Sequence, residues 1–274
     1  MLLLGQALEK LHARELPPRS VAITFDDGMS DFYSRAYPLL KSCGFPVTVY
    51  QTTYYSDYQR PIFNLICSYM LWKHRGKVLD AGVELGLKPP LDLRTEASRD
   101  EIVRRLMQLA EADHLNGAEK DALAVRLAQM LEVDYSELLR KRLLHVMSPQ
   151  EISQLAAAGV DFQLHAHRHC TPMDEAFFRK EIQENRERLE SMTKRDAVHF
   201  CYPSGEYHSQ FLPWLAAEGV VSAATCNPGL ATPRSHPLLL PRFVDTSARK
   251  VAEFEGWLAG VGSLLALKRF NKAG

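Results

Sequence analysis

Two adjacent carboxylates, Asp26 and Asp27, are the residues of this 274-residue chain whose types and spacing first suggest chemistry. They follow the apolar and β-branched run at residues 21–25 and precede Gly28, so a buried strand is expected to end on two acids in a turn. Consecutive side chains at the tip of a strand point in different directions. One carboxylate can therefore bind a metal ion while its neighbour acts as a base.

A second polar cluster lies far downstream and also follows an apolar run. His165, His167 and His169 come directly after residues 160–164. His165 and His169 are four residues apart, a spacing that places both on one side of a helical turn. Two imidazoles and one carboxylate suit Zn²⁺ or another borderline divalent ion and leave positions open for water and substrate. With the remaining aspartate as base, such a site would hydrolyse an amide or ester.

Two other interpretations of the histidine cluster stay open and rank below this one. His165 and His167 could be the HxH pair of an amidohydrolase barrel, although the acids here precede the histidines. Alternatively, Cys170 could join the histidines in a structural zinc site, for which the chain offers no second Cys/His cluster of suitable spacing.

Alternating strands and helices position the two clusters. Strands over 20–25 and 46–50, separated by a helix over 30–42, are the signature of a parallel α/β unit. A Ser148–Glu151 capping box starts the helix that leads into the histidine strand. Further strands are expected at 160–164, 198–202, 220–225 and 238–242, and further helices at 2–14, 174–194, 209–218 and 248–259.

Residues 57–144 have a different, mostly helical pattern with no residues arranged for chemistry. Capping boxes are expected at Ser98 with Glu101 and at Asn116 with Glu119. We interpret the stretch as a helical insertion in a single domain that spans 1–274. A separate four-helix domain is the alternative.

Composition narrows the class of protein. The chain is 46% hydrophobic and 24% charged, which is typical of a globular protein. Its 33 basic and 33 acidic residues balance, so counterion-driven binding of nucleic acid is not predicted. Five cysteines without a CxxC pair indicate a reducing compartment. The first residues do not form a signal peptide, and no apolar run could span a membrane, which predicts a cytoplasmic protein unless upstream residues are missing.

A third motif, Phe200-Cys201-Tyr202-Pro203-Ser204-Gly205, follows the first two. In order and spacing the three motifs resemble those of the polysaccharide deacetylase family (the NodB homology domain), over about residues 19–56 and 145–245. The resemblance implies an α/β fold, a distorted (β/α) barrel with its site at the carboxyl ends of the strands. It also implies hydrolysis of the N-acetyl group of an amino sugar in a polysaccharide or glycan precursor.

The resemblance also implies roles for individual residues. Asp26 would be the general base, while Asp27, His165 and His169 would bind one divalent ion. Zn²⁺ is the expected ion, with Co²⁺, Ni²⁺ or Mn²⁺ as alternatives. The backbone N–H of Ser204 would help to hold the developing oxyanion. The expected partner is an N-acetylated glycan, and the oligomeric state is left open.

The chain departs from the family pattern at three points. Ala166 stands where a Ser or Thr usually follows the first histidine. Cys201 stands where the family has an Arg that pairs with the base, and Arg242 in the last expected strand could supply that charge instead. No histidine clearly takes the general-acid position, for which His199 and His236 are the candidates.

These departures keep two other functions open. One is hydrolysis of a non-sugar C–N bond on the same fold. The other is a non-catalytic glycan-binding protein that kept the metal, which the replaced Arg and the unassigned acid favour. An Asp26→Asn substitution should abolish the activity of an enzyme and hardly affect a binding protein.

Overall fold

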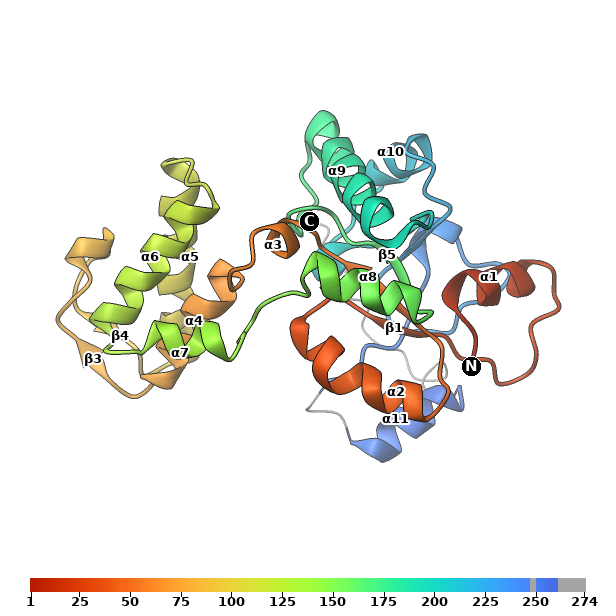
Figure 1. Ribbon diagram of the computed structural model, residues 1–274, viewed down its shortest axis with the longest axis horizontal. Helices are drawn as coiled ribbons and strands as arrows, with labels where there is room; N and C mark the ends of the chain where they lie inside the picture. Colours follow the sequence, from red (N-terminus) through yellow and green to blue (C-terminus); the bar gives the residue numbers. More distant parts are fainter. Residues whose placement is uncertain (247–249, 261–274) are drawn as a thin grey trace. The chain divides into compact units, whose positions relative to one another are not determined.

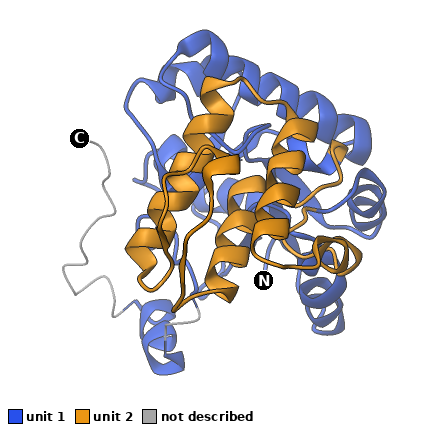
Figure 2. Cartoon of the chain, turned by 90° about the vertical axis from the view of Figure 1, so that its left-hand side faces the viewer, with its two compact units in different colours: residues 1–56, 147–274 blue, residues 57–146 orange. Residues whose placement is uncertain are grey.

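The computed structural model describes residues 1–246 and 250–260 (Figure 1). The chain divides into two compact units, residues 1–56 with 147–274 and residues 57–146, which Figure 2 colours separately. The second unit begins and ends within two residues of the predicted insertion. Whether it counts as an insertion or as a separate domain stays a prediction.

A parallel sheet forms the centre of the first unit. Its strands, in their order across the sheet, are β1 (Ile23–Phe25), β2 (Val47–Gln51), β5 (Asp161–Leu164), β6 (His199–Cys201) and β7 (Ser222–Ala224). All four neighbouring pairs are parallel, and the sheet curls into a half-barrel. The carboxyl ends of all five strands therefore lie along one edge. This brings Asp27 and His165 together although 138 residues separate them in the sequence.

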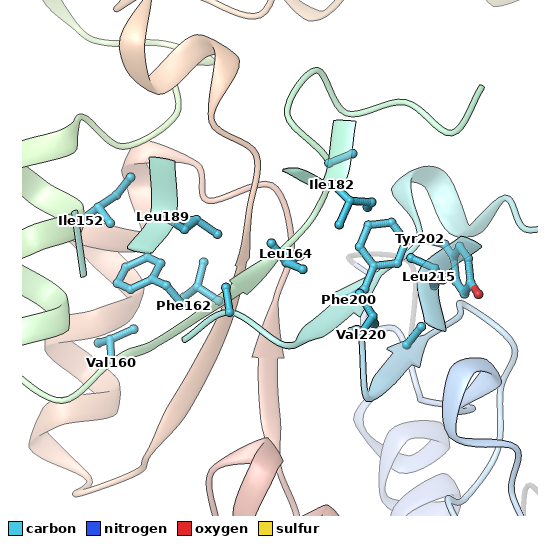
Figure 3. Close-up of a cluster of buried hydrophobic side chains, with 14 of the residues drawn as sticks. Ile152, Val160, Phe162, Leu164, Ile182, Leu189, Phe200, Tyr202, Leu215 and Val220 are labelled. Carbon is cyan, nitrogen blue, oxygen red and sulfur yellow. The ribbon is translucent and has the colours of Figure 1, made fainter. Parts of the chain in front are cut away.

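Helices pack against one face of this sheet because alternate strand residues are apolar. They are the π-helix η1 (Phe32–Ala36), α2 (Tyr37–Ser42), α8 (Pro149–Ala157), α9 (Glu175–Thr193) and α10 (Phe211–Ala217). Figure 3 shows part of this core, in which Phe162 and Leu164 of β5 lie beside Ile152 of α8 and Leu189 of α9. The core fixes the register of β5, and with it the position at which the histidine loop begins.

The opposite face of the sheet packs against the first helix. Helix α1 (Leu4–His12) places Leu4, Leu8 and Leu11 against Tyr50 and Cys201. These strand residues alternate with Val49 and Phe200 of the main core, as the two-residue period of a strand requires. Both faces of the sheet are therefore buried, which is typical of parallel sheets.

Two of the three predicted capping boxes are confirmed. Ser148 Oγ accepts the backbone N–H of Glu151, and Glu151 accepts that of Ser148, at the start of α8. Asn116 and Glu119 do the same at the start of α6 (Gly117–Met130). The box at Ser98 is wrong: α5 (Glu96–Ala112) begins earlier, because the Thr95 hydroxyl accepts the N–H of Ser98 and so caps the helix first.

The second unit has its own hydrophobic core, which includes the fully buried Ile66, Leu106 and Leu127. Besides α5 and α6 it contains α4 (Phe63–Lys73), α7 (Tyr135–Arg140), the short η2 (Val83–Leu85) and an antiparallel pair, β3 (Val78–Leu79) with β4 (Leu91–Asp92). The short helix α3 (Tyr54–Asp57) lies at the boundary between the units. The β3–β4 pair was not predicted, since strands of two residues carry no periodic pattern.

Two predicted elements near the carboxyl end differ from the structure. The strand over 238–242 is reduced to a single parallel bridge between Leu240 and Ala224, after the short helix η4 (Pro237–Leu239). Pro241 has no N–H to continue the ladder. The last helix is α11 (Val251–Leu258), and residues 248–249 of its predicted range lie outside the described residues.

Within the described ranges, no helix is long and apolar enough to cross a membrane. The cytoplasmic location stays a prediction.

Candidate metal centre and catalytic pair

The turn after β1 gives the two adjacent acids different directions. Asp27 and Gly28 both adopt left-handed backbone conformations, with φ of 65° and 71°. A Cβ atom at position 28 would lie 1.8 Å from Gln51 Oε1, so any residue other than glycine would have to displace that side chain and adopt a strained backbone conformation. Gln51, the last residue of β2, also donates a hydrogen bond to the Asp27 carbonyl at 3.3 Å. The neighbouring strand thus fixes the turn that carries both carboxylates.

Asp27 meets two histidines of the downstream cluster. Its Oδ1 atom lies 3.0 Å from His165 Nε2 and 3.1 Å from His169 Nε2. One ligand atom from each of the three residues lies within 4.8 Å of the other two, and the described part of the chain holds no other group of three His, Cys, Asp or Glu residues with this geometry. Cys170 is not a member of the group. His167 turns elsewhere, with its Nδ1 2.8 Å from Thr53 Oγ1.

This donor set fits a divalent ion such as Zn²⁺. Two ligands about 2.0 Å from a tetrahedral ion lie roughly 3.3 Å apart, close to the separations observed here. His165 Nδ1 lies 2.8 Å from the Cys201 carbonyl oxygen. Since only a protonated nitrogen can donate to that carbonyl, Nε2 is left to face Asp27 and to bind a metal.

Electrostatics within the group favour charged forms. Burial opposes the charge on Asp27, but hydrogen bonds with His165 and His169 hold its pKa far below the ordinary value. Burial likewise opposes a charge on His165, yet its hydrogen bond with Asp27 raises the His165 pKa well above the ordinary value. A divalent ion would replace a proton at this nitrogen, in the way that metal and proton compete for any imidazole ligand.

Asp26, the other acid, forms a bidentate ion pair with Arg242. The Oδ1 and Oδ2 atoms accept from Arg242 Nη1 and Nη2 at 2.8 and 2.5 Å. Arg242 Nε donates to the Thr225 carbonyl at 2.9 Å, which holds the guanidinium in place. Burial alone would raise the pKa of Asp26, but the hydrogen bond and charge of Arg242 lower it below the ordinary value. Asp26 is therefore ionised at neutral pH.

Cys201 leaves room for this arginine. Cys201 stands at the sequence position where the family motif has its own arginine. Its Sγ atom lies 3.0 Å from Arg242 Nη2. A thiol is small enough for a guanidinium from the segment after η4 to reach Asp26. The structure thus brings together Asp26 and Arg242, which the sequence analysis linked only through their opposite charges.

Ser204 and the two general-acid candidates, His199 and His236, have no described hydrogen bond to Asp26 or to the three ligands. Ser204 lies in the short helix η3 (Pro203–Gly205) with φ of 56°, and no described hydrogen bond joins it to Asp26 or to the three ligands. His199 lies two residues before Cys201 and bonds Ser222 Oγ at 2.8 Å, while His236 accepts the Leu238 N–H at the start of η4. None of these roles is established, and the general acid stays unassigned.

Comparison with known proteins gives the family. The family model for polysaccharide deacetylases matches residues 13–89 and 127–222, which is more than half of the chain. The chain belongs to the polysaccharide deacetylase family. Among curated proteins there is no match.

Solved structures support the fold. A Streptococcus pyogenes deacetylase, PplD in complex with acetate, is 17% identical with a TM-score of 0.58, over 94% of this chain and 78% of that one. IcaB from Ammonifex degensii is 15% identical with a TM-score of 0.56, over 94% and 81%. These likenesses confirm the predicted distorted (β/α) barrel. Family membership supports carbohydrate deacetylation as the class of activity.

The sequence analysis missed two polar residues that contact the histidine loop, Glu181 and Asn185 of α9. The sequence pattern of α9 could have indicated both residues. They fall on the same helical face as Phe178, Ile182 and Leu189, all of which are buried. Polar residues on an otherwise apolar face of a helix indicate specific buried contacts.

Proposed function

We propose that this protein is a metal-dependent carbohydrate N-deacetylase that removes N-acetyl groups from amino sugars of a polysaccharide or glycan precursor. The observation that carries the proposal is the pairing of two arrangements at one edge of the barrel. A carboxylate and two imidazoles form a set of metal ligands, and an adjacent carboxylate is held ionised by Arg242. The two acids are consecutive in the chain, so a base would lie beside a bound ion.

Asp27, His165 and His169 would hold one divalent ion, Zn²⁺ first and Co²⁺, Ni²⁺ or Mn²⁺ as alternatives. When bound, such an ion acts as a Lewis acid and lowers the pKa of water to about 7. The Cys201 carbonyl keeps His165 in the tautomer that binds through Nε2.

Asp26 would take the proton from the attacking water, because Arg242 keeps it ionised and holds its orientation. Water adds to the acetyl carbon, and the backbone N–H of Ser204 would stabilise the negative charge on the oxygen. Cleavage of the C–N bond then gives acetate and the free amine of the sugar. The residue that protonates the leaving amine is not among those assigned.

Metal analysis and acetate release test the proposal together. We expect about one divalent ion per chain in the wild type and none in His169→Ala. His208→Ala is a matched control, because His208 accepts the Gln210 N–H, contacts the Phe211 ring and is not one of the three ligands. Acetate release from N-acetylglucosamine oligomers should require the ion. No metal in the wild type, even after addition of Zn²⁺ or Co²⁺, would remove the basis of the proposal.

A second candidate is a glycan-binding protein without turnover, which the unassigned general acid favours. For such a protein, Asp26→Asn would leave both metal content and glycan affinity unchanged. Hydrolysis of a non-sugar C–N bond would instead appear as Asp26-dependent activity on small amides but not on glycan oligomers.

A further inference from the structure

One face of helix α9 makes buried polar contacts with the loop that carries the histidines. Glu181 and Asn185 are four residues apart and hence lie on the same side of the helix, and both are fully buried. The residues around them, Phe178, Ile182 and Leu189, are apolar. Polar groups in such surroundings destabilise the fold unless they are hydrogen-bonded. The partners of these two side chains therefore indicate what they stabilise.

Asn185 links a metal-ligand residue to the neighbouring strand. Its Oδ1 atom accepts the backbone N–H of His165 at 2.8 Å. Its Nδ2 atom donates to the Gln51 carbonyl and to Thr53 Oγ1, both at 3.0 Å. Gln51 is the last residue of β2, so one side chain ties the start of the histidine loop to the end of that strand.

Glu181 holds the middle of the same loop. Its backbone carbonyl accepts the N–H of His167 at 3.1 Å, and its Oε2 atom accepts the N–H of Arg168 at 2.6 Å. The Oε1 atom also pairs with Arg168 Nη1 at 2.5 Å. Helix α9 therefore accepts three backbone N–H groups of the loop.

The loop needs this support because its backbone is strained. Ala166 and His169 have φ of 59° and 57°, in the left-handed region that side chains other than glycine rarely adopt. Such conformations persist only where the surrounding structure holds them. Without the contacts to α9, the loop would have lower-energy conformations in which His165 and His169 do not both face Asp27.

We propose that Asn185 and Glu181 are positioning residues that hold loop 165–169 in its metal-binding conformation and so set the affinity of the site for its ion. The inference rests on the proposed metal-binding role of Asp27, His165 and His169. A preorganised loop loses less conformational entropy when the ion binds, and removal of an outer partner of a ligand weakens metal binding by about 10- to 100-fold.

The test is the Zn²⁺ dissociation constant of the full chain after treatment with a chelator, measured by competition with a chromophoric chelator. Asn185→Ala should weaken binding about 10- to 100-fold. Asn185→Asp keeps an oxygen for the His165 N–H but loses the donor to the Gln51 carbonyl, so it should restore only part of the affinity. Glu190→Gln is the matched control, because Glu190 is also on α9 but accepts the N–H of Ala197, outside the loop. It should bind like the wild type.

Circular dichroism separates a positioning role from loss of the fold. A folded Asn185→Ala protein with wild-type affinity would overturn the inference. If that variant does not fold, Glu181→Gln decides. It should bind at least about threefold more weakly, since a neutral amide pairs less strongly with Arg168, and unchanged affinity would overturn the inference.

The same measurements separate this inference from the proposed function. Weakened variants together with a wild type that binds Zn²⁺ but releases no acetate would support the inference and contradict the deacetylase. If the wild type releases acetate and the variants bind Zn²⁺ as tightly as the wild type, the deacetylase proposal is supported and this inference is contradicted. A wild type that binds no Zn²⁺ would contradict both.

Discussion

Replacing Arg242 by methionine tests the catalytic pair most directly. The substitution removes two hydrogen bonds to Asp26 and one to the Thr225 carbonyl while keeping most of the apolar stem. Breaking a fully buried ion pair by removing one partner costs about 3 to 5 kcal/mol. The side chains of Arg242 and Asp26 are 15% and 32% exposed, so water can partly solvate the remaining carboxylate. We therefore expect a loss of about 2 to 3 kcal/mol in the free energy of unfolding at pH 7.

The pH dependence of this loss follows from the pKa of Asp26. In the wild type, Arg242 holds that pKa below its ordinary value of 3.8, so the pair stabilises the fold above about pH 4 and loses its effect as the pH falls further. In the variant the pKa of Asp26 rises, since burial and the charge of Asp27 then act without Arg242. The difference in stability between the two proteins should thus be largest near neutral pH and shrink towards pH 4.

Urea unfolding followed by circular dichroism measures the effect, with an expected midpoint shift of roughly 1 M. Asp26→Asn added to Arg242→Met should recover at least half of the loss, because no unpaired charge remains. The matched control is Arg94→Met, which breaks an exposed bidentate pair with Asp92 and should shift the urea midpoint far less, because water solvates both groups. Equal losses for both arginines, or no recovery in the double variant, would refute the reasoning.

Three further predictions concern the base, the second unit and the cysteines. Asp26→Asn should lower the rate of acetate release by about 10²- to 10⁴-fold while metal content stays at the wild-type level, and loss of the metal would contradict the division of roles between the two acids. Leu106→Ala removes a fully buried side chain from the core of the second unit and should cost about 2 to 5 kcal/mol in urea unfolding, so a change below about 1 kcal/mol would show a poorly packed core. Exposed Cys43 should react with a thiol reagent at pH 8 much faster than Cys67, because burial raises the pKa of Cys67, and equal rates would contradict the burial.

Much of the first unit could be predicted because its signals are local. Apolar runs before Asp26 and before His165 mark β1 and β5, and the Ser148 capping box marks the start of α8. Even so, η1 has a π-helical hydrogen-bond pattern and the strand predicted at 238–242 is a single bridge. Whether a segment joins a ladder depends on its neighbours as well as on its own residues.

The second unit shows the limit of periodic patterns. Its longer helices were recognisable, but the capping residue of α5 was assigned three residues too late, at Ser98 instead of Thr95. The chain near this position offers two hydroxyl side chains, and only the folded backbone decides which accepts the N–H. The β3–β4 pair was missed because pairing between Leu79 and Leu91 leaves no repeat in the sequence.

The sequence by itself determined which chemical groups the site has and the order of the elements that carry them, since motif spacing and apolar periodicity are properties of the chain. Only the tertiary structure decided which distant groups meet. Arg242 reaches Asp26 across 216 residues because Cys201 leaves space for it, and Asn185 holds His165 because one face of α9 packs on the sheet. Such contacts depend on the register of strands and the rotation of a helix, which packing of the whole core sets and no local pattern encodes.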